Sequence, residues 1–336
     1  MQYPDIDIVI IGINAEKYLD DCLQSILASD YPQEKLHIIY SDGGSSDQSI
    51  AIAQKYPNVK TIVLQGSSPT PGKGRNQGYL LGSSPYVHFL DCDTTLEKGW
   101  LKKAVSYMEN SIAAVCGYRQ EKYPEKNIFH RIIHVEWSYE PGLCRYFGGD
   151  VLVRRKILEE VGGFDANLIA GEDPDLSYRI RQKGYRILRS KDTMTFHDIN
   201  MRKFSQYYKR AYRTGYGYAE LGMRFRNEQE KLWWKELLRV TLIAGASWTA
   251  LFVSVILYYL QISWQVCIFI LLGGLFLAFR NLIKIYKIQK KWNIDLLFSI
   301  YYALHLGISL HIQFFGVLRF TWGKLFRNPL SNRRLK

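Results

Sequence analysis

The nine residues YVHFLDCDT (86–94) end a short apolar run on two carboxylates, Asp91 and Asp93. An apolar run of about four to eight residues bounded by polar residues is typical of a buried strand. The runs DIDIVIIGI (5–13) and LHIIYS (36–41) have the same character, and the second leads into the turn DGGSSD (42–47). Polar turns therefore follow apolar strands repeatedly in the first hundred residues.

Helical patterns separate these strands. Apolar side chains recur at helical spacing over 17–29, and further helices are expected over 49–56 and from Gly74 onward. Strands that alternate with helices predict βαβ units, and hence an α/β fold with a mostly parallel sheet. Ligands bind at the carboxyl ends of the strands in such sheets. No GxGxxG, GxxxxGKS or GxxxxGKT loop follows the first strand, which argues against a classical dinucleotide-binding fold or a P-loop.

Charge is distributed unevenly along the 336 residues. The formal net charge is +13, with 23 basic against 26 acidic side chains over 1–200 and 21 against 5 over 201–336. Residues 240–279 carry no charged side chain, whereas one membrane-spanning helix needs only about 20 apolar residues. These features exclude an ordinary soluble protein. They favour basic segments beside membrane spans over a nucleic-acid-binding surface, so we expect membrane lipids, and no nucleic acid, as partners.

Two membrane spans are predicted, at 240–260 and about 262–282, joined by a short turn into a helical hairpin. A third apolar run, 296–318, carries a stripe of polar side chains every three or four residues, namely Ser299, Tyr302, His305, Ser309 and Gln313. Basic clusters follow both the second span and this third run. Two spans would put both clusters on the side of the first 200 residues, as the positive-inside bias favours. We expect two spans plus a re-entrant or interfacial helix, and three spans stay open because the run is long enough.

The predicted organisation has four parts. An α/β domain (1–200) precedes amphipathic interfacial helices (201–239), a transmembrane hairpin (240–283), and a region (284–336) with a basic loop, the third apolar helix and a basic tail. Solvated helices packed on the α/β domain are the alternative for the second part. The first residues lack the features of a signal peptide, so we expect the α/β domain in the cytoplasm and multi-pass anchoring in the cell membrane. Five widely spaced cysteines indicate incidental reduced thiols.

Two acidic segments carry the strongest chemical signals. Asp91 and Asp93 flank one residue at a strand end, where they could bind Mg²⁺ with a diphosphate completing its shell. Glu172, Asp173 and Asp175 open a helix, where acidic residues commonly act as caps. A carboxylate there could instead act as a general base.

Four other residues carry weaker signals. Asp42 could accept from a base N–H or a ribose hydroxyl, and an Asx turn explains it equally well. Lys73 and Arg75, in GKGRNQG, could contact phosphates, and Asn76 could cap or bond locally.

Six blocks occur in a fixed order along the chain: GINAEKYLDDCLQSIL, YSDGGSSDQS, PGKGRNQG, FLDCDT, GGDVLVRRKILEEVGGFD and GEDPDLSYRIRQKGY. Together they closely resemble the family 2 glycosyltransferases of GT-A fold, a Rossmann-like α/β fold, over about residues 5–200. The resemblance implies that residues 1–200 form a GT-A glycosyltransferase domain. It implies a nucleotide-sugar donor of UDP or GDP type.

The resemblance also implies roles for the acidic residues. Asp42 matches the aspartate that reads the nucleotide base. Asp91 and Asp93 match the DxD motif that holds Mg²⁺ or Mn²⁺ on the sugar-nucleotide diphosphate, so Asp91 also counts as nucleotide-binding. Asp173 matches the catalytic base of the ED motif, with Glu172 beside it.

Further residues match blocks near the donor. Lys73, Arg75 and Asn76 fall in one such block and are expected to bind the nucleotide. Arg179 lies in the helix that follows the base. His197 falls where the family often has a histidine near the metal or diphosphate, and a packed structural histidine is the alternative.

The family is predominantly inverting, so the resemblance implies a single displacement at the anomeric carbon. Processive members carry a QxxRW motif, and the comparable region here, KRAYRTGYGYAE, lacks it. We therefore expect a non-processive, membrane-anchored enzyme with a lipid-linked or other membrane acceptor on the cytoplasmic face. The alternative is a catalytically inactive membrane scaffold that kept the fold, against which the intact acidic motifs argue.

Overall fold

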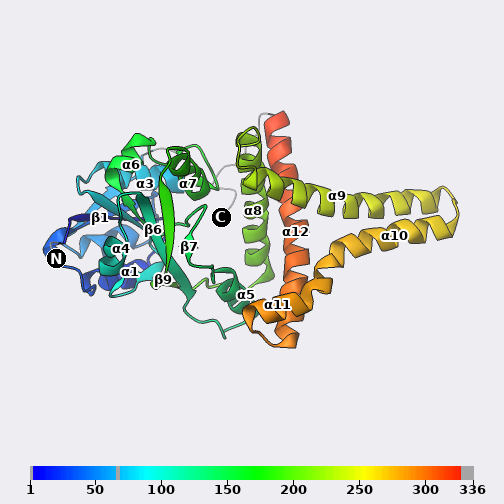
Figure 1. The fold of residues 1–336 in the computed structure, drawn as a ribbon, viewed down its shortest axis with the longest axis horizontal. Helices are drawn as coiled ribbons and strands as arrows, with labels where there is room; N and C mark the ends of the chain where they lie inside the picture. Colours follow the sequence, from blue (N-terminus) through cyan, green and yellow to red (C-terminus); the bar gives the residue numbers. More distant parts are fainter. Residues whose placement is uncertain (1–2, 66–68, 327–336) are drawn as a thin grey trace. The chain divides into compact units, whose positions relative to one another are not determined.

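A computed structural model describes residues 3–65 and 69–326 (Figure 1). The chain divides between Asn200 and Met201 into two compact units. All the described strands lie in the first unit, and the described part of the second is helical.

One nine-stranded sheet forms the centre of the first unit. Its order is β3-β2-β1-β4-β8-β6-β9-β5, and β7 also pairs with β9. The strands are β1 (Ile6–Gly12), β2 (Leu36–Asp42), β3 (Val59–Val63), β4 (Tyr86–Asp91), β5 (Thr94–Leu96), β6 (Ile112–Glu121), β7 (Gly142–Leu143), β8 (Val151–Arg154) and β9 (Arg186–His197).

The pairing confirms the predicted α/β fold with a mostly parallel sheet. β1, β2, β3 and β4 are parallel to one another, and β6 is parallel to β9. β8 runs antiparallel between β4 and β6, and the short strands β5 and β7 run antiparallel to β9. The sheet is therefore parallel in its first half and mixed in its second.

Seven α-helices and a 3₁₀ turn (Gln33–Lys35) accompany the described sheet. The helices are α1 (Leu19–Leu27), α2 (Ser49–Gln54), α3 (Pro71–Leu80), α4 (Trp100–Ser106), α5 (Ile128–Glu136), α6 (Arg155–Glu160) and α7 (Glu172–Gln182). α1 buries Leu19, Cys22, Leu23 and Ile26, which lie on one face at the predicted helical spacing. α3 starts where Thr70 accepts a hydrogen bond from the backbone of Lys73 and Pro71 occupies the first turn.

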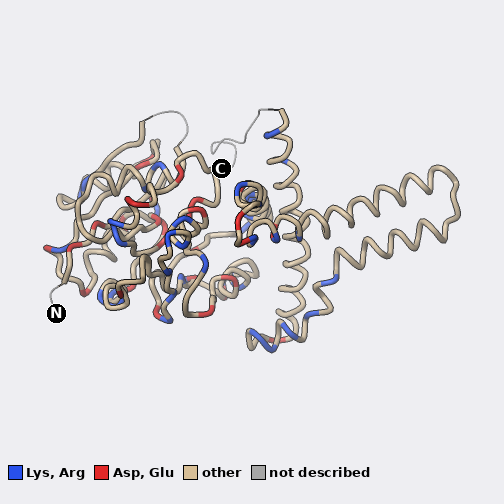
Figure 2. Tube along the Cα trace, turned by 45° about the horizontal axis from the view of Figure 1, so that its top comes forward, with Lys and Arg blue, Asp and Glu red and all other residues tan. Residues whose placement is uncertain are grey.

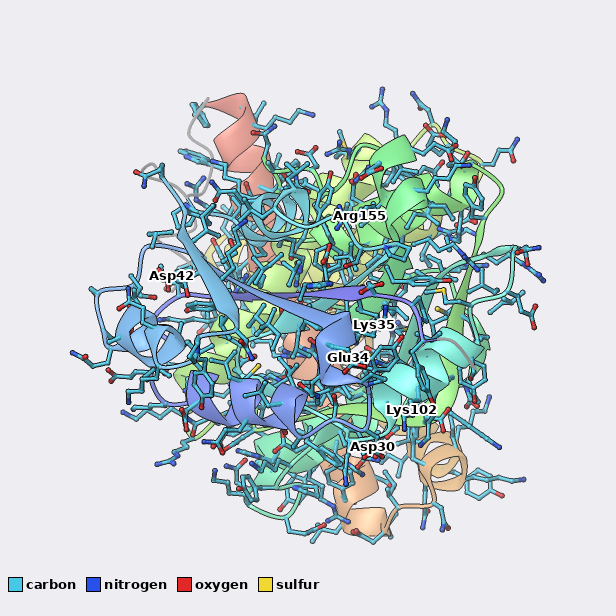
Figure 3. The ribbon with its side chains drawn as sticks, turned by 90° about the vertical axis from the view of Figure 1, so that its left-hand side faces the viewer. Asp30, Glu34, Lys35, Asp42, Lys102 and Arg155 are labelled. Atoms are coloured by element: carbon cyan, nitrogen blue, oxygen red, sulfur yellow. The ribbon has the colours of Figure 1, made fainter. Side chains whose placement is uncertain are left out.

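The strand register brings the carboxyl ends of three strands to the same level, at one end of the sheet. Ile11 pairs with both Ser41 and Asp91, and Gly12 pairs with Asp42. The carboxyl ends of β1, β2 and β4 are thus level. In Figure 3, Glu34 lies just before the start of β2 and Asp42 marks its end, the end at which these strands finish.

The second unit consists of α8 (Phe204–Arg224), α9 (Leu232–Tyr259), α10 (Trp264–Phe279), a 3₁₀ turn (Arg280–Lys284), α11 (Ile285–Trp292) and α12 (Leu296–Leu325). α9 and α10 form a hairpin, and α8 and α12 lie side by side (Figure 1). Three helical segments of the described chain are long and apolar enough to cross a membrane: Leu232–Tyr259, Trp264–Trp292 and Leu296–Leu325. The first two contain the predicted hairpin, and the third contains the ambiguous run.

Candidate active site

Asp91 ends β4, where the carboxyl ends of β1, β2 and β4 lie level with one another. The backbone N–H of Cys92 donates to the carbonyl of Ile11 (3.0 Å), and the Thr94 hydroxyl donates to the carbonyl of Asp91 (2.8 Å). These bonds fix the turn that carries Asp93. The side chains of Asp91 and Asp93 are 26% and 42% exposed, so both carboxylates reach solvent where ligands bind in such sheets.

Arg75 on α3 gathers three carboxylates. Its side chain is only 3% exposed, and Nη2 lies 3.0 Å from Asp91 Oδ1. Nη1 lies 2.8 Å from Glu172 Oε1 and 3.2 Å from Asp173 Oδ1. The planar guanidinium suits such forked contacts. The guanidinium of Arg75 joins the carboxylate at the end of β4 to those in the first turn of α7, and its predicted donor-binding role stays a prediction.

A second buried pair holds Asp91 from the other side. Asp150 is buried, and one of its oxygens accepts a hydrogen bond from the backbone N–H of Asp91 (3.0 Å). Arg119 Nη2 lies 3.1 Å from Asp91 Oδ2 and 2.8 Å from Asp150 Oδ2. Burial raises the pKa of Asp150, and the Arg119 charge opposes that rise. The Asp91 carboxylate is therefore fixed in position by two arginines.

The backbone of the loop before β8 also contacts Asp91. A Cβ added at Gly149 would lie 2.3 Å from Asp91 Oδ2, whereas one added at Gly148 would meet nothing within 4 Å. A side chain at Gly149 would therefore displace the carboxylate, and one at Gly148 would not.

Asp93 faces His197 at the end of β9. Asp93 Oδ2 and His197 Nε2 are 3.2 Å apart, and the His197 ring stacks on Trp137 with centroids 5.1 Å apart and planes 14° apart. Burial raises the pKa of Asp93, but the hydrogen bond and charge of His197 outweigh it, so the net shift is downward. Two neighbouring ligands of an octahedral ion with bonds of about 2.1 Å lie about 3 Å apart, so Asp93 and His197 fit a divalent cation. The Asp93 carboxylate is a ligand that suits Mg²⁺ and Mn²⁺, whereas the His197 imidazole suits the later transition metals better.

Another group in the described residues brings three possible ligand atoms within 4.8 Å of one another: Glu121, His130 and Asp198. His130 Nδ1 lies 2.9 Å from Glu121 Oε1, and Lys126 Nζ lies 3.1 Å from Asp198 Oδ2. These ion pairs fasten the start of α5 to the ends of β6 and β9, and we read the group as structural.

Asp173 lies in the first turn of α7. The residue before the helix, Gly171, has φ 91°, a left-handed conformation that favours glycine. Burial raises the pKa of Asp173 to about 8; Arg75 opposes the rise, and the negative charges of Glu172 and Asp91 add to it. A carboxyl group that titrates near neutral pH is suited to accept a proton during a reaction.

Asp42 is fully buried at the end of β2. One of its oxygens accepts from the backbone N–H groups of Gly44 (2.8 Å) and Ser45 (2.6 Å). The other accepts from the hydroxyls of Tyr40 (2.8 Å) and Ser45 (2.6 Å). These four bonds use the capacity of the carboxylate, as in the Asx turn that the sequence left open. A contact from Asp42 to a nucleotide base would need Ser45 to turn away, and it stays a prediction.

The two other residues of the predicted donor block lie on α3. Asn76 donates to the Phe164 carbonyl (2.7 Å) and accepts from the Phe164 N–H (2.9 Å), so both functions of its amide join α3 to the loop before α7. Lys73 lies half-buried in the first turn, where the free N–H groups of a helix favour anions.

A cavity of about 540 Å³ lies at the opposite end of the strands, lined by Asp7, Glu34 and His37 among others. Its buried carboxylate, Asp7, forms an ion pair with Arg155 (labelled in Figure 3) and accepts hydrogen bonds from Ser84. Because this carboxylate is fully paired, we place the candidate active site at the carboxyl ends of β1, β2 and β4 and not at this cavity.

Sequence reasoning missed three residues of the site: Arg119, Trp137 and Asp150. The GGD sequence that ends at Asp150, directly before the apolar residues VLV (151–153), was a usable signal for Asp150. Arg119 carries no local signal, because it meets Asp91 only through the pairing of β6 with β8. Trp137 carries none either, because it follows α5 and stacks on His197, which is distant in the sequence.

Comparisons with known proteins agree with this geometry. The profile described as "Glycosyl transferase family 2" matches residues 7–167. The probable glycosyltransferase YdaM of Bacillus subtilis is 27% identical over 211 residues, which cover 55% of this chain and 49% of that protein. The glycosyltransferase AglE of Haloferax volcanii is 25% identical over 232 residues, 66% of this chain and 75% of that protein. The chain thus spans about half the length of the first of these relatives.

A solved structure covers nearly the whole chain. The mannosyltransferase PcManGT of Pyrobaculum calidifontis, in complex with GDP-Man and Mn²⁺, aligns with a TM-score of 0.62 at 17% identity. The alignment covers 96% of this chain and 88% of that one. At this identity the likeness shows a shared fold.

Proposed function

We propose that this chain, which matches the family 2 glycosyltransferases over residues 7–167, moves one sugar from a nucleotide-sugar donor to a lipid-linked acceptor. The transfer inverts the anomeric centre, is not processive, and takes place at the cytoplasmic face of the membrane. The observation that carries the proposal is the buried Arg75, which contacts Asp91 and the Glu172–Asp173 pair at once. One side chain thereby sets the distance between a donor-binding carboxylate and a proton-accepting one.

Asp91, Asp93 and His197 are the residues that would hold Mg²⁺ or Mn²⁺. A divalent cation there would offset the charge that develops on the leaving nucleoside diphosphate. The donor in complex with the Pyrobaculum relative, GDP-Man with Mn²⁺, supports this pairing of cation and nucleotide sugar. Arg75 and Arg119 keep the Asp91 carboxylate oriented through its two oxygens.

Asp173 acts as the general base. It takes the proton from an acceptor hydroxyl while that oxygen forms a bond to the anomeric carbon and the bond to the diphosphate oxygen breaks. The transition state resembles an oxocarbenium ion, as in glycoside hydrolysis, and one displacement inverts the configuration. Lys73, at the amino end of α3, binds the donor phosphates.

The helical second unit supports a membrane acceptor. Helices that cross the bilayer hold the catalytic domain at its surface, where lipid-linked hydroxyls are concentrated. The missing QxxRW motif and the small number of candidate spans support transfer of a single sugar and not polymer export.

The test uses the purified full chain with Mn²⁺, a panel of radiolabelled UDP- and GDP-sugars, and a membrane lipid extract. We expect one sugar nucleotide to transfer label into the organic phase, with inverted configuration in the product. Label that stays in water with every donor in the panel would contradict the lipid acceptor. A product with retained configuration would contradict the single displacement.

A further inference from the structure

We infer that α12 lies in the plane of the membrane interface, with its outer face among lipid acyl chains, and that only the α9–α10 hairpin crosses the bilayer. The inference concerns the second unit alone and does not depend on the proposed reaction. By length and composition α12 could cross a membrane, as could the two segments before it. Its packing separates it from them.

α12 has two faces of opposite character. Apart from Leu296 at its first position, its exposed large apolar side chains recur along one row at intervals of three, four or seven residues. They are Leu297, Tyr301, Ile308, Phe315, Leu318, Trp322 and Leu325. The sequence places a polar stripe on the same helix, and four of its members, Ser299, Tyr302, His305 and Ser309, are buried. The polar side is thus covered by protein, and the side left open is apolar as far as the last two turns, where Thr321 and Lys324 are also exposed.

α8 is the helix that covers the polar side. The hydroxyl of Tyr207 lies 2.8 Å from His305 Nδ1, and further along the rings of Tyr216 and Phe320 are 5.3 Å apart. Between these points the backbones touch: a Cβ at Gly316 would lie 2.2 Å from the Tyr212 carbonyl oxygen. α8 and α12 therefore run in the same direction as one closely packed pair.

This pairing makes a third crossing costly. α8 exposes Lys209 and Arg210 and leaves Arg213 half-buried, all within the stretch that runs along α12. If α12 crossed the bilayer, α8 would be carried into the hydrocarbon with these charges, which are expensive there. If α12 lies in the interface with its apolar row toward the acyl chains, the same charges stay on the aqueous side, as in an interfacial amphipathic helix.

The α9–α10 hairpin differs from α12 in how little of it is buried by protein and in how few charges lie beside it. Within their most apolar windows, the segments Leu232–Tyr259 and Trp264–Trp292 are 22% and 17% buried, against 50% for α12. Figure 1 shows the hairpin projecting away from the α8–α12 pair, and Figure 2 shows it almost free of charge, with a basic cluster at α11. Trp248 on α9 contacts Phe315 of the exposed row, with ring centroids 5.5 Å apart, so the apolar row continues the lipid-facing surface of the hairpin.

Depth measurements on the full chain in phosphatidylglycerol-containing vesicles test the inference. The five cysteines are replaced, and a nitroxide label is placed singly at Tyr301, Ile308, Phe315 or Trp322. Tyr301 and Trp322 are about 32 Å apart along a helix axis. We expect all four labels at one depth, about 5–10 Å below the headgroups.

Labels at Leu242, Leu251 and Tyr258 on α9 form the matched series, and there we expect the greatest depth at Leu251, near the midplane, and smaller depths at the other two. A steady change along α12 that passes through the midplane, or a maximum at its centre, would overturn the inference. A constant depth along α9 would overturn the two-crossing topology. Thermal unfolding of each labelled chain in detergent shows which variants keep the native fold. A labelling site that disrupts the fold can be replaced by Leu318 or Leu325, which lie in the same exposed row.

Discussion

Replacing Arg75 with methionine should move the pH dependence of sugar transfer toward alkaline pH. Arg75 is the only described cation within ion-pair distance of Asp173, whose pKa is about 8 with Arg75 in place. An adjacent opposite charge typically lowers a carboxyl pKa by about 1–3 units, so its loss should raise the pKa of Asp173 by that amount. At pH 7.5 about a quarter of the Asp173 side chains are ionised in the native chain, from the pKa of about 8. In Arg75→Met the ionised fraction should fall roughly tenfold to several hundredfold.

The assay is the pH profile of kcat/KM for transfer at saturating Mn²⁺. Activity should rise with pH, because the base must be deprotonated, and it should level off above the pKa of Asp173. Arg75→Lys keeps a positive charge but loses the forked contacts of the guanidinium, so its pH profile should shift less than that of Arg75→Met. Loss of a buried partner costs about 3–5 kcal/mol of stability, but partial unfolding lowers the amplitude without moving the inflection. A folded Arg75→Met chain with the native inflection would refute the link between Arg75 and the base.

Three further substitutions test separate contacts. Gly149→Ala should lower kcat/KM at least tenfold while Gly148→Ala stays near the native value, because only the first Cβ meets Asp91; equal activities would contradict the close approach. Trp137→Leu removes the ring stacked on His197 and should raise the Mn²⁺ concentration for half-maximal activity about 10- to 100-fold, as measured by metal titration after chelation; an unchanged titration would separate His197 from the cation. Asp7→Ala removes the buried carboxylate that pairs with Arg155 and should destabilise the first unit by about 3–5 kcal/mol in denaturant titrations, whereas Asp30→Ala, in an exposed ion pair with Lys98, should cost less than 1 kcal/mol.

The sequence was most informative where neighbouring residues carry the signal. An apolar strand followed by DCD predicts both β4 and a carboxylate at its end, because strand and turn are local. The alternation of apolar strands with helical patterns predicts the α/β fold for the same reason. The polar stripe over 299–313 argued from the sequence alone against a third membrane span, and in the structure four of its five side chains are buried.

The sequence was least informative where distant segments meet. Arg75 carries a positive charge in a Gly-rich segment, which favours a phosphate contact, and only the fold shows the carboxylates of Glu172 and Asp173 around it. Asp150 lies 59 residues from Asp91 and reaches it because β8 inserts antiparallel beside β4, a pairing that no local pattern reports. Asp42 looks available in DGGSSD, yet the loop folds back and supplies three donors to it, and Tyr40 on β2 supplies a fourth.

The most direct test of the central claim compares Asp173→Asn with Asp192→Asn in the purified full chain. Both changes remove one carboxylate charge at nearly constant shape, and Asp192 contacts Lys103 and Tyr107 away from the site. With Mn²⁺ and the donor that the panel identifies, Asp173→Asn should lower sugar transfer about 10²- to 10⁴-fold, and Asp192→Asn should leave it unchanged. Undiminished transfer by Asp173→Asn would contradict the account.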